Sequence, residues 1–179
     1  MSIKSNRFKR VGVLGGTFDP PHEGHIEISK SAIKKLKLSL IIWAVTKRNP
    51  LKKSPTSSLK KRIALSKRKI NKIKNITVKS YDNLINSSKT IDQVKHINKH
   101  GDSNIFFLMG SDSLVNFHKW HQWQEIAKLA KLVVFPRLKY LKKARLCKAL
   151  KILGKKKILF MKTKIVDISS SKLRKNYLR

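Results

Sequence analysis

Short apolar runs alternate along this chain with longer segments in which apolar residues recur at helical spacing. A short continuous apolar run is typical of a buried strand, and a periodic apolar stripe is typical of a helix with one face on a core. The pattern predicts strands at residues 10–16, 39–46, 75–80, 103–110 and 131–137, and a weaker one within 156–169. It predicts helices at 24–38, 59–72, 87–101, from about 120, at 140–154 and from 169 onward.

Strands that alternate with helices form βαβ units, and these units build a parallel sheet with helices on both faces. We therefore predict an α/β fold: a single Rossmann-like, doubly wound domain over residues 1–179, with a mainly parallel sheet of five to six strands. Ligands of such sheets bind beyond the carboxyl ends of the strands, near the point where strand order reverses. Three chemically suggestive stretches follow strands directly, at 15–25, 110–112 and 168–174.

The charge of the chain is extreme, because 43 Lys and Arg face nine Asp and Glu, which gives a formal net charge of +34. Such a surface attracts phosphates, nucleic acids and anionic lipids. The basic residues are spread through nearly every segment, so we interpret most of them as compositional bias rather than as a binding stripe. A basic nucleic-acid-binding module is the alternative from another class. It predicts salt-sensitive binding without turnover and gives no reason for the motifs at the strand ends.

Cysteine content and hydropathy narrow the setting of the protein. The single cysteine, Cys147, excludes a disulfide framework and a cysteine-based zinc cluster. No run approaches the roughly 18 apolar residues of a membrane span. The apolar stretch at 11–14 is too short for the core of a signal peptide. We expect a soluble, cytoplasmic protein with neither a membrane nor a specific nucleic acid as partner.

The stretch GGTFDPPHEGH follows the first predicted strand. Its two leading glycines, one of them Gly16, permit a tight turn and close approach to a ligand. His22 and His25 lie one turn apart at a helix start, where N–H groups and imidazoles can bind phosphate. The spacing fits neither the dinucleotide fingerprint nor the P-loop. Two alternatives are a plain strand–turn–helix junction with exposed histidines and a zinc site, for which Asp19 is the only near third ligand.

Two further stretches carry candidate chemistry. In ISSSKLR, three hydroxyls precede Lys172 and Arg174 at a helix start, which suits an anion, although a capped helix end would look the same. Asp112 at a strand end could take a ribose hydroxyl or cap the next helix. Trp120 lies beside histidines and a lysine and could stack on a ring, whereas we expect Trp123 to pack in the core. Two anion-ready helix starts on one sheet suggest a polyphosphate held between the chain ends.

Taken together, these stretches closely resemble the nucleotidyltransferase superfamily marked by an HxGH motif and, within it, the bacterial nicotinate-nucleotide adenylyltransferases. The matching stretches are GGTFDPPHEGH, NPLKK, KTIDQV, FFLMGSDSLVNFHKWHQWQEI and DISSSKLR. The resemblance implies adenylyl transfer from ATP to nicotinate mononucleotide, which yields deamido-NAD and pyrophosphate in NAD biosynthesis. It also implies Mg²⁺ with the ATP and no covalent intermediate.

The resemblance also implies which residues form the site. The catalytic residues would be His22, His25 and Arg174. The ATP-binding residues would be these three together with Gly16, Thr17, Phe18, Gly110, Asp112 and Ser170. The mononucleotide would contact Lys52, Thr90, Trp120 and His121, and no protein ligand for a metal is expected.

Two sister activities are alternatives to this interpretation. Pantetheine-phosphate adenylyltransferases share the glycine-led first motif but typically have only the second histidine of the pair. His22, the NPLK loop and Trp120 argue against that activity. A nicotinamide-mononucleotide adenylyltransferase would differ only in a few contacts around one ring. Lys89 stands where the resembled family usually has an aromatic residue, directly before Thr90.

Overall fold

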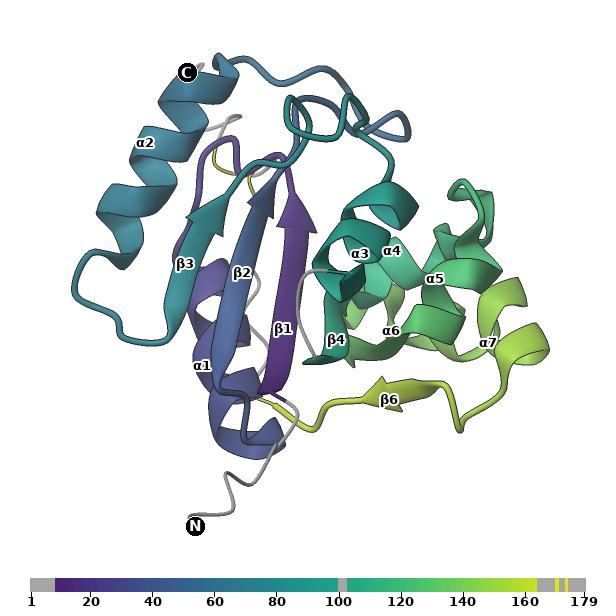
Figure 1. Cartoon of the computed structure of the whole chain (residues 1–179). Coiled ribbons are helices and arrows are strands. Elements are labelled where there is room, and N and C mark those ends of the chain that lie inside the picture. Colours follow the sequence, from purple (N-terminus) through teal and green to yellow (C-terminus); the bar gives the residue numbers. More distant parts are fainter. Residues whose placement is uncertain (1–8, 100–102, 164–169, 171–172, 174–179) are drawn as a thin grey trace, which may run out of the picture.

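The sheet of this protein has six strands in the order β3-β2-β1-β4-β5-β6 (Figure 1). The structure is a computed structural model and describes residues 9–99, 103–163, 170 and 173. The strands are β1 (Lys9–Gly16), β2 (Leu40–Val45), β3 (Ile76–Lys79), β4 (Ser103–Gly110), β5 (Ala130–Phe135) and β6 (Ile158–Phe160). Every neighbouring pair is parallel, so the predicted doubly wound α/β fold is confirmed.

The helices match most of the predicted periodic segments. They are α1 (Glu23–Leu36), α2 (Leu59–Ile70), α3 (Thr90–Lys99), α4 (Ser111–Val115), η1 (Phe117–Lys119), α5 (Trp123–Leu129), α6 (Leu138–Arg145) and α7 (Lys148–Leu153). In the described part of the chain, no helix is long and apolar enough to cross a membrane. The helix predicted from 169 lies outside the described residues, except for Ser170 and Leu173.

Two helix predictions were wrong in detail. The segment 140–154 forms two helices, because the chain leaves helical geometry at Leu146 and is extended at Cys147 (ψ 155°). This break allows Ala144 and Ala149 both to be fully buried. The helix predicted from about 120 begins at Trp123, after a residue with left-handed backbone geometry.

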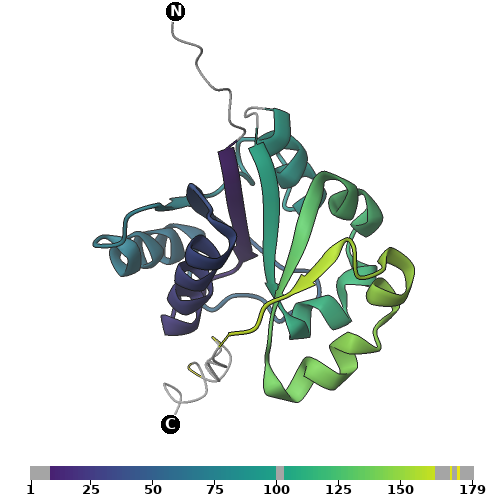
Figure 2. The same ribbon diagram turned by 90° about the horizontal axis from the view of Figure 1, so that it is seen from below.

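Side chains alternate between the two faces of the sheet, and each face has its own core. On one face, Ile26 of α1 and Ile70 of α2 pack with Phe106 of β4. On the other face, α3 to α7 pack on alternate strand residues such as Phe107. Figures 1 and 2 show these two helical layers on opposite sides of the sheet. The prediction of helices on both faces is therefore confirmed.

The strand order reverses between β1 and β4, which lie side by side at the centre of the sheet. β1 leads into α1 on one face, and β4 leads into α4 on the other. Chains that diverge in this way leave a crevice at the carboxyl ends of the two strands. These ends are Gly16 and Gly110, which both belong to predicted motifs.

Candidate active site

The junction between β1 and α1 places two imidazoles next to each other. His22 is the N-cap of α1, and His25 is the third residue of the helix. The backbone N–H of His22 donates to Nδ1 of His25 over 3.1 Å, and the two ring centroids are 3.8 Å apart. Because His25 Nδ1 accepts this hydrogen bond, the ring proton of the neutral imidazole is on Nε2. The network thus leaves an N–H donor of His25 for a ligand.

The turn in this motif is made by Phe18 and not, as the sequence analysis expected, by the glycine pair. Gly15 and Gly16 are the last residues of β1 and pair with β2. Phe18 has a φ of 49°, which non-glycine residues rarely adopt. Its ring is buried 4.6 Å from the His25 ring and 5.0 Å from the Trp43 ring, centroid to centroid. This packing compensates for the unusual backbone conformation of Phe18 and holds the His25 ring in place.

Burial and neighbouring cations keep both histidines neutral. Burial lowers the pKa of His22 to about 4, and the charges of Arg137 and Lys69 act in the same direction, while Glu23 opposes them. Burial also lowers the pKa of His25 well below its usual value, assisted by His22, Arg137 and Lys52. Nδ1 of His22 is buried and has no hydrogen-bond partner among the described residues. The pair therefore offers neutral N–H donors rather than two imidazolium charges.

The carboxyl end of β4 is joined to that of β5 through Arg137. Arg137 Nε lies 3.2 Å from Asp112 Oδ1, an ion pair without the alignment of a hydrogen bond. The backbone N–H of Arg137 also donates to Ser111 Oγ over 2.9 Å. A Cβ at Gly110 would lie 2.3 Å from Asp112 Oδ1, so any other residue here would displace the Asp112 carboxylate.

Arg137 is a further candidate site residue, which no sequence motif indicated. Its charge lowers the pKa values of both His22 and His25, which places it at the same edge of the sheet as the histidine pair. The signal was present in the stretch FPR, since Arg137 follows a strand directly, as the other motifs do. Among so many basic residues, this one had no distinguishing feature.

The last motif reaches the first one through Ser170. Its hydroxyl donates to the carbonyl oxygen of Pro20 over 3.0 Å. Residues 150 positions apart in the sequence are thereby in contact. The structure thus brings one member of the predicted ATP-binding set beside the histidine motif. Arg174, the other candidate in this motif, lies outside the described residues.

The residues predicted to bind the mononucleotide come from three separate elements. Thr90 is the first residue of α3. Trp120 follows η1 and packs edge-on against Phe107 and Phe117, with centroid distances of 6.0 and 5.3 Å. His121 is exposed. Trp120 thus combines core packing on one edge with a surface that is only half-buried.

Lys52 and Trp123 complete the predicted set. Lys52 is exposed in the loop between β2 and α2, and its charge contributes to lowering the pKa of His25. It therefore lies within electrostatic range of the histidine pair, as a phosphate-binding residue would. Trp123 packs on Phe117 at 5.9 Å, which confirms its expected place against the core.

Asp19, the third ligand of the alternative zinc site, instead makes hydrogen bonds that stabilise the fold. Its Oδ2 accepts hydrogen bonds from the backbone N–H of Thr56, over 2.7 Å, and from the Thr56 hydroxyl, over 3.0 Å. The carboxylate is almost completely buried. It ties the histidine motif to the loop before α2 rather than forming a ligand set with the two imidazoles.

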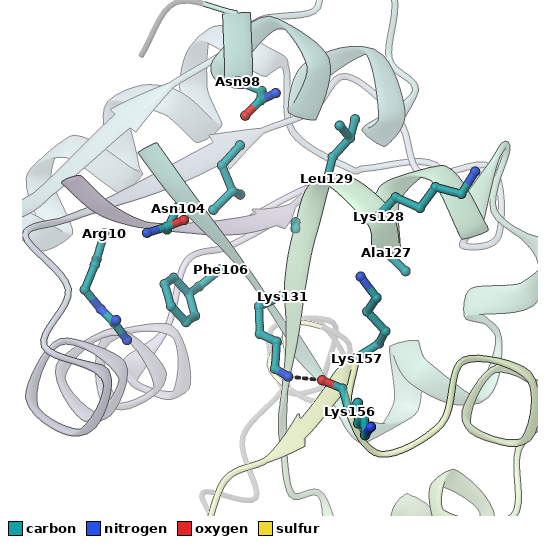
Figure 3. Close-up of a pocket in the computed structure, with 12 residues that line it drawn as sticks. Arg10, Asn98, Asn104, Phe106, Ala127, Lys128, Leu129, Lys131, Lys156 and Lys157 are labelled. Carbon is teal, nitrogen blue, oxygen red and sulfur yellow. Dashed lines mark hydrogen bonds between the residues drawn. The ribbon is translucent and has the colours of Figure 1, made fainter. Parts of the chain in front are cut away.

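A cavity of about 760 Å³ opens at the opposite edge of the sheet, around the amino ends of β1, β4 and β5 (Figure 3). Its basic lining residues are Arg10, Lys128, Lys131, Lys156 and Lys157. Several of them already have partners: Lys128 pairs with Glu125 over 3.1 Å, and Lys131 donates to the carbonyl of Lys156. The Arg10 guanidinium lies 4.7 Å from the centroid of the Phe106 ring. Phe106 belongs to one of the matching stretches, but none of the predicted site residues lines this cavity, which lies away from the histidine motif.

Comparison with known proteins places this geometry in a family. The cytidylyltransferase-like family model matches residues 13–176. A protein of Pelagibacter ubique (strain HTCC1062), named "Probable nicotinate-nucleotide adenylyltransferase", is 46% identical over 93% of this chain and 92% of its own length. A protein of Ruegeria sp. (strain TM1040) with the same name is 38% identical over 62% of this chain and 58% of its own length.

Two solved structures of Plasmodium falciparum nicotinic acid mononucleotide adenylyltransferase share the fold. The complex with APC has a TM-score of 0.73 at 18% identity, and the complex with NaAD has a TM-score of 0.73 at 20% identity. Each match covers 93% of this chain and 83% of the Plasmodium chain. At such identities the likeness concerns the fold, whereas the bacterial relative carries the closer relationship. The chain therefore belongs to the cytidylyltransferase-like family and, within it, to the nicotinate-nucleotide adenylyltransferases.

Proposed function

We propose that this enzyme transfers the adenylyl group of ATP to nicotinate mononucleotide, forming deamido-NAD and pyrophosphate, as a single-domain protein of the cytoplasm. The observation that carries the proposal is the neutral pair of His22 and His25 at the start of α1. The pair lies where strand order reverses, and the charges of Arg137 and Lys52 act on it. Membership of the family supplies the reaction.

The reaction requires alignment more than covalent participation. A phosphate oxygen of the mononucleotide attacks the α-phosphorus of ATP in line, the bond to the bridging oxygen breaks, and pyrophosphate leaves. Catalysis of phosphoryl-type transfers is mainly positioning and electrostatic stabilisation. The Nε2–H of His25, set by the hydrogen bond to its Nδ1, donates to a phosphate oxygen on which negative charge is concentrated.

The ATP side of the crevice follows from the residues at the ends of β1 and β4. We assign His22, His25, Ser170 and Arg174 to the phosphates of ATP. We assign the backbone of Gly16, Thr17 and Phe18 to the lining of the ATP cleft, and Gly110 with Asp112 to the adenosine. The contact of Ser170 with Pro20 supports a polyphosphate held between the first and last motifs.

The mononucleotide side is formed by Lys52, Thr90, Trp120 and His121. The half-buried Trp120 ring stacks on the pyridine ring, and Lys52 binds the mononucleotide phosphate. Backbone N–H groups near Thr90 and His121 meet the ring substituent. Donors of this kind suit a carboxylate, whose oxygens only accept, better than an amide, which must also place two N–H groups. The surplus of cations favours the more anionic substrate as well.

Nucleotidyltransferases that use ATP typically need a divalent metal ion, and we propose Mg²⁺. In the described part of the chain, no three His, Cys, Asp or Glu residues gather into a metal site. An ion that enters with the phosphate oxygens of ATP needs no cage of protein ligands, so these residues fit such an ion. When bound, the ion neutralises phosphate charge, and the protein residues orient the complex.

Pyrophosphate release from ATP, measured with one acceptor at a time, tests the proposed function. The acceptors are nicotinate mononucleotide, nicotinamide mononucleotide and phosphopantetheine. We expect the highest kcat/KM with nicotinate mononucleotide. Equal or better efficiency with the nicotinamide form would contradict the acceptor assignment, and release with none of the three would contradict adenylyl transfer itself.

A further inference from the structure

Arg62 on α2 is a buried cation that binds main-chain carbonyls from two loops, the one after β1 and the one between β2 and α2. Its side chain is 2% exposed. Nη1 donates to the carbonyls of Thr17 and Thr46 over 2.5 and 2.8 Å, and Nη2 donates to the carbonyl of Lys47 over 3.1 Å. Nε donates to the carbonyl of Ser57 over 3.0 Å. One guanidinium thus joins the loops after β1 and β2 to the segment before α2.

Burial of this guanidinium is costly, and the structure compensates for it locally. Desolvation lowers the pKa of Arg62, while the nearby carboxylates of Asp19 and Asp82 act in the opposite direction. Carbonyl oxygens accept these four hydrogen bonds in a fork geometry that a lysine cannot reproduce. A side chain placed at such cost, with every bond directed at a loop, positions those loops.

Asp82, in the loop after β3, extends the contacts toward α3. Its Oδ2 accepts from the Thr46 hydroxyl, the Lys47 N–H and the Ser88 hydroxyl over 2.9, 2.7 and 2.7 Å. Its Oδ1 accepts from Gln93 Nε2 over 3.0 Å. The Arg62–Asp82 network therefore runs without interruption from the loop after β1 to the first turn of α3.

The carbonyls that Arg62 binds belong to loops on the two proposed sides of the crevice. The carbonyl of Thr17 belongs to the segment that carries the histidine motif, whereas Thr46 and Lys47 begin the loop that carries Lys52. The reacting atoms of the two substrates must meet within a few tenths of an ångström of the productive geometry. A misplacement of about 1 Å can lower a rate by roughly a hundredfold.

We propose that Arg62 is a positioning residue that fixes the distance between the ATP-side loop and the mononucleotide-side loop. It touches neither substrate, and it acts by holding the carbonyls of Thr17, Thr46 and Lys47 in one arrangement. The proposal rests on the proposed function, because that function requires both loops to present their substrates to each other.

Arg62→Lys is the test, because it keeps the charge and loses the fork. Arg68→Lys, the same substitution at an exposed position of α2, is the matched control. We expect Arg62→Lys to lower kcat per folded protein at least tenfold. The Kd of α,β-methylene ATP and the Kd of nicotinate mononucleotide, each measured alone by calorimetry, should change less than threefold. An unchanged kcat, or a weakened binding of one substrate that accounts for the whole loss, would overturn the proposal.

Hydrogen exchange separates this proposal from the proposed function. The N–H groups of Lys47 and Thr56 are bonded to the buried carboxylates of Asp82 and Asp19. They should exchange at least tenfold faster in Arg62→Lys than in Arg68→Lys. Normal exchange would overturn the positioning role even if adenylyl transfer is confirmed. Faster exchange in a protein whose wild type transfers no adenylyl group would uphold the loop contact and reject the reaction.

A milder variant covers the case in which Arg62→Lys does not fold. Thr46→Val keeps the shape of the side chain and removes its hydrogen bond to Asp82 Oδ2. We expect a two- to fivefold lower kcat and faster exchange of the Lys47 N–H. If Thr46→Val folds with both quantities unchanged, the network does not set the loop separation.

Discussion

The two halves of the crevice are built differently. On the proposed ATP side, the rings of Phe18, His22, His25 and Trp43 form a continuous packed group, with neighbouring centroids 3.8 to 5.7 Å apart. The Trp43 Nε1–H donates to Ser29 Oγ, which donates to the His25 carbonyl, so the group is also tied by hydrogen bonds. Little in this half can move without its neighbours.

The residues of the proposed mononucleotide side, as far as the structure describes them, lack such mutual packing. Lys52 and His121 are exposed, and Trp120 is half-buried. The difference suits the demands of the proposed reaction. Charge stabilisation at phosphorus requires donors fixed before the substrate arrives. Recognition of a ring requires only a stacking surface and a few donors, which substrate binding can complete. The packed half should therefore govern kcat and the open half should govern acceptor choice.

The largest effect should come from the packed half. His25→Ala should leave the fold intact and lower turnover at least tenfold, because preorganised donors to a developing charge are often worth about 2.7–4 kcal/mol. Steady-state kinetics and thermal melting are the measurements. His96→Ala, at the other end of α3 from Thr90, is the control and should retain turnover. Unchanged turnover in a normally folded His25→Ala protein would remove this histidine from the mechanism.

The free energy of unfolding should fall at acid pH, because His22 in the packed half is buried in its neutral form. The pKa of His22 is about 4 in the folded protein, below the value of 6.5 for the unfolded chain. The unfolded state therefore binds more protons between these two pH values. The contribution of neutral His22 to the free energy of unfolding is fully present above pH 6.5 and is lost as the pH falls toward 4. Linkage gives a loss of about 2 kcal/mol between pH 7 and pH 5 from His22 alone.

His22→Asn isolates this contribution, because asparagine is a good N-cap and does not titrate. Urea unfolding at pH 7 and pH 5 should show a smaller pH dependence in the variant, by about 2 kcal/mol. The same pH dependence in both proteins would mean that His22 is not held neutral by burial.

Gly16→Ala tests whether ATP lies against the end of β1. A Cβ at this position would meet the Phe18 ring at 3.5 Å, an ordinary contact, so the fold should tolerate it. We expect unchanged melting and a KM for ATP that rises about tenfold, since the methyl group occupies space that a ligand needs. Gly12→Ala is the opposite control: its Cβ would lie 2.8 Å from Leu38 Cδ1 and should lower stability without changing the KM. An unchanged KM in Gly16→Ala would move ATP away from this strand end.

The sequence was informative where a local pattern determines a local structure. The apolar runs located all six strands, and the motifs at 15–25 and 110–112 fell at the carboxyl edge, because strand ends follow from hydropathy and parallel topology from alternation. The position of His22 and His25 at a helix start was likewise predictable from the glycine and the following periodicity.

Contacts between residues far apart in the sequence could not be predicted from local patterns. Arg62 was one cation among many in a predicted helix, although its spacing with Ser66 and Ile70 places it on the buried face. The roles of Asp82 and Arg137 depend on which loops meet, and no local pattern contains that information. The turn at Phe18 was missed because tertiary packing of its ring outweighs the preference for glycine at positive φ.

The smallest expected effect concerns the open half, where two tryptophans form a matched pair. Trp120 and Trp123 both pack edge-on against Phe117, so replacing either by alanine should lower stability. Only Trp120→Ala should also raise the KM for nicotinate mononucleotide, by about fivefold to tenfold, since a lost ring stack is worth roughly 1 kcal/mol. The KM for ATP should stay within twofold in both variants, because the packed half is untouched. If Trp123→Ala raises the mononucleotide KM as much as Trp120→Ala does, the effect arises from general loosening of this region. In that case the pyridine ring does not stack on Trp120, and acceptor choice must come from elsewhere in the open half.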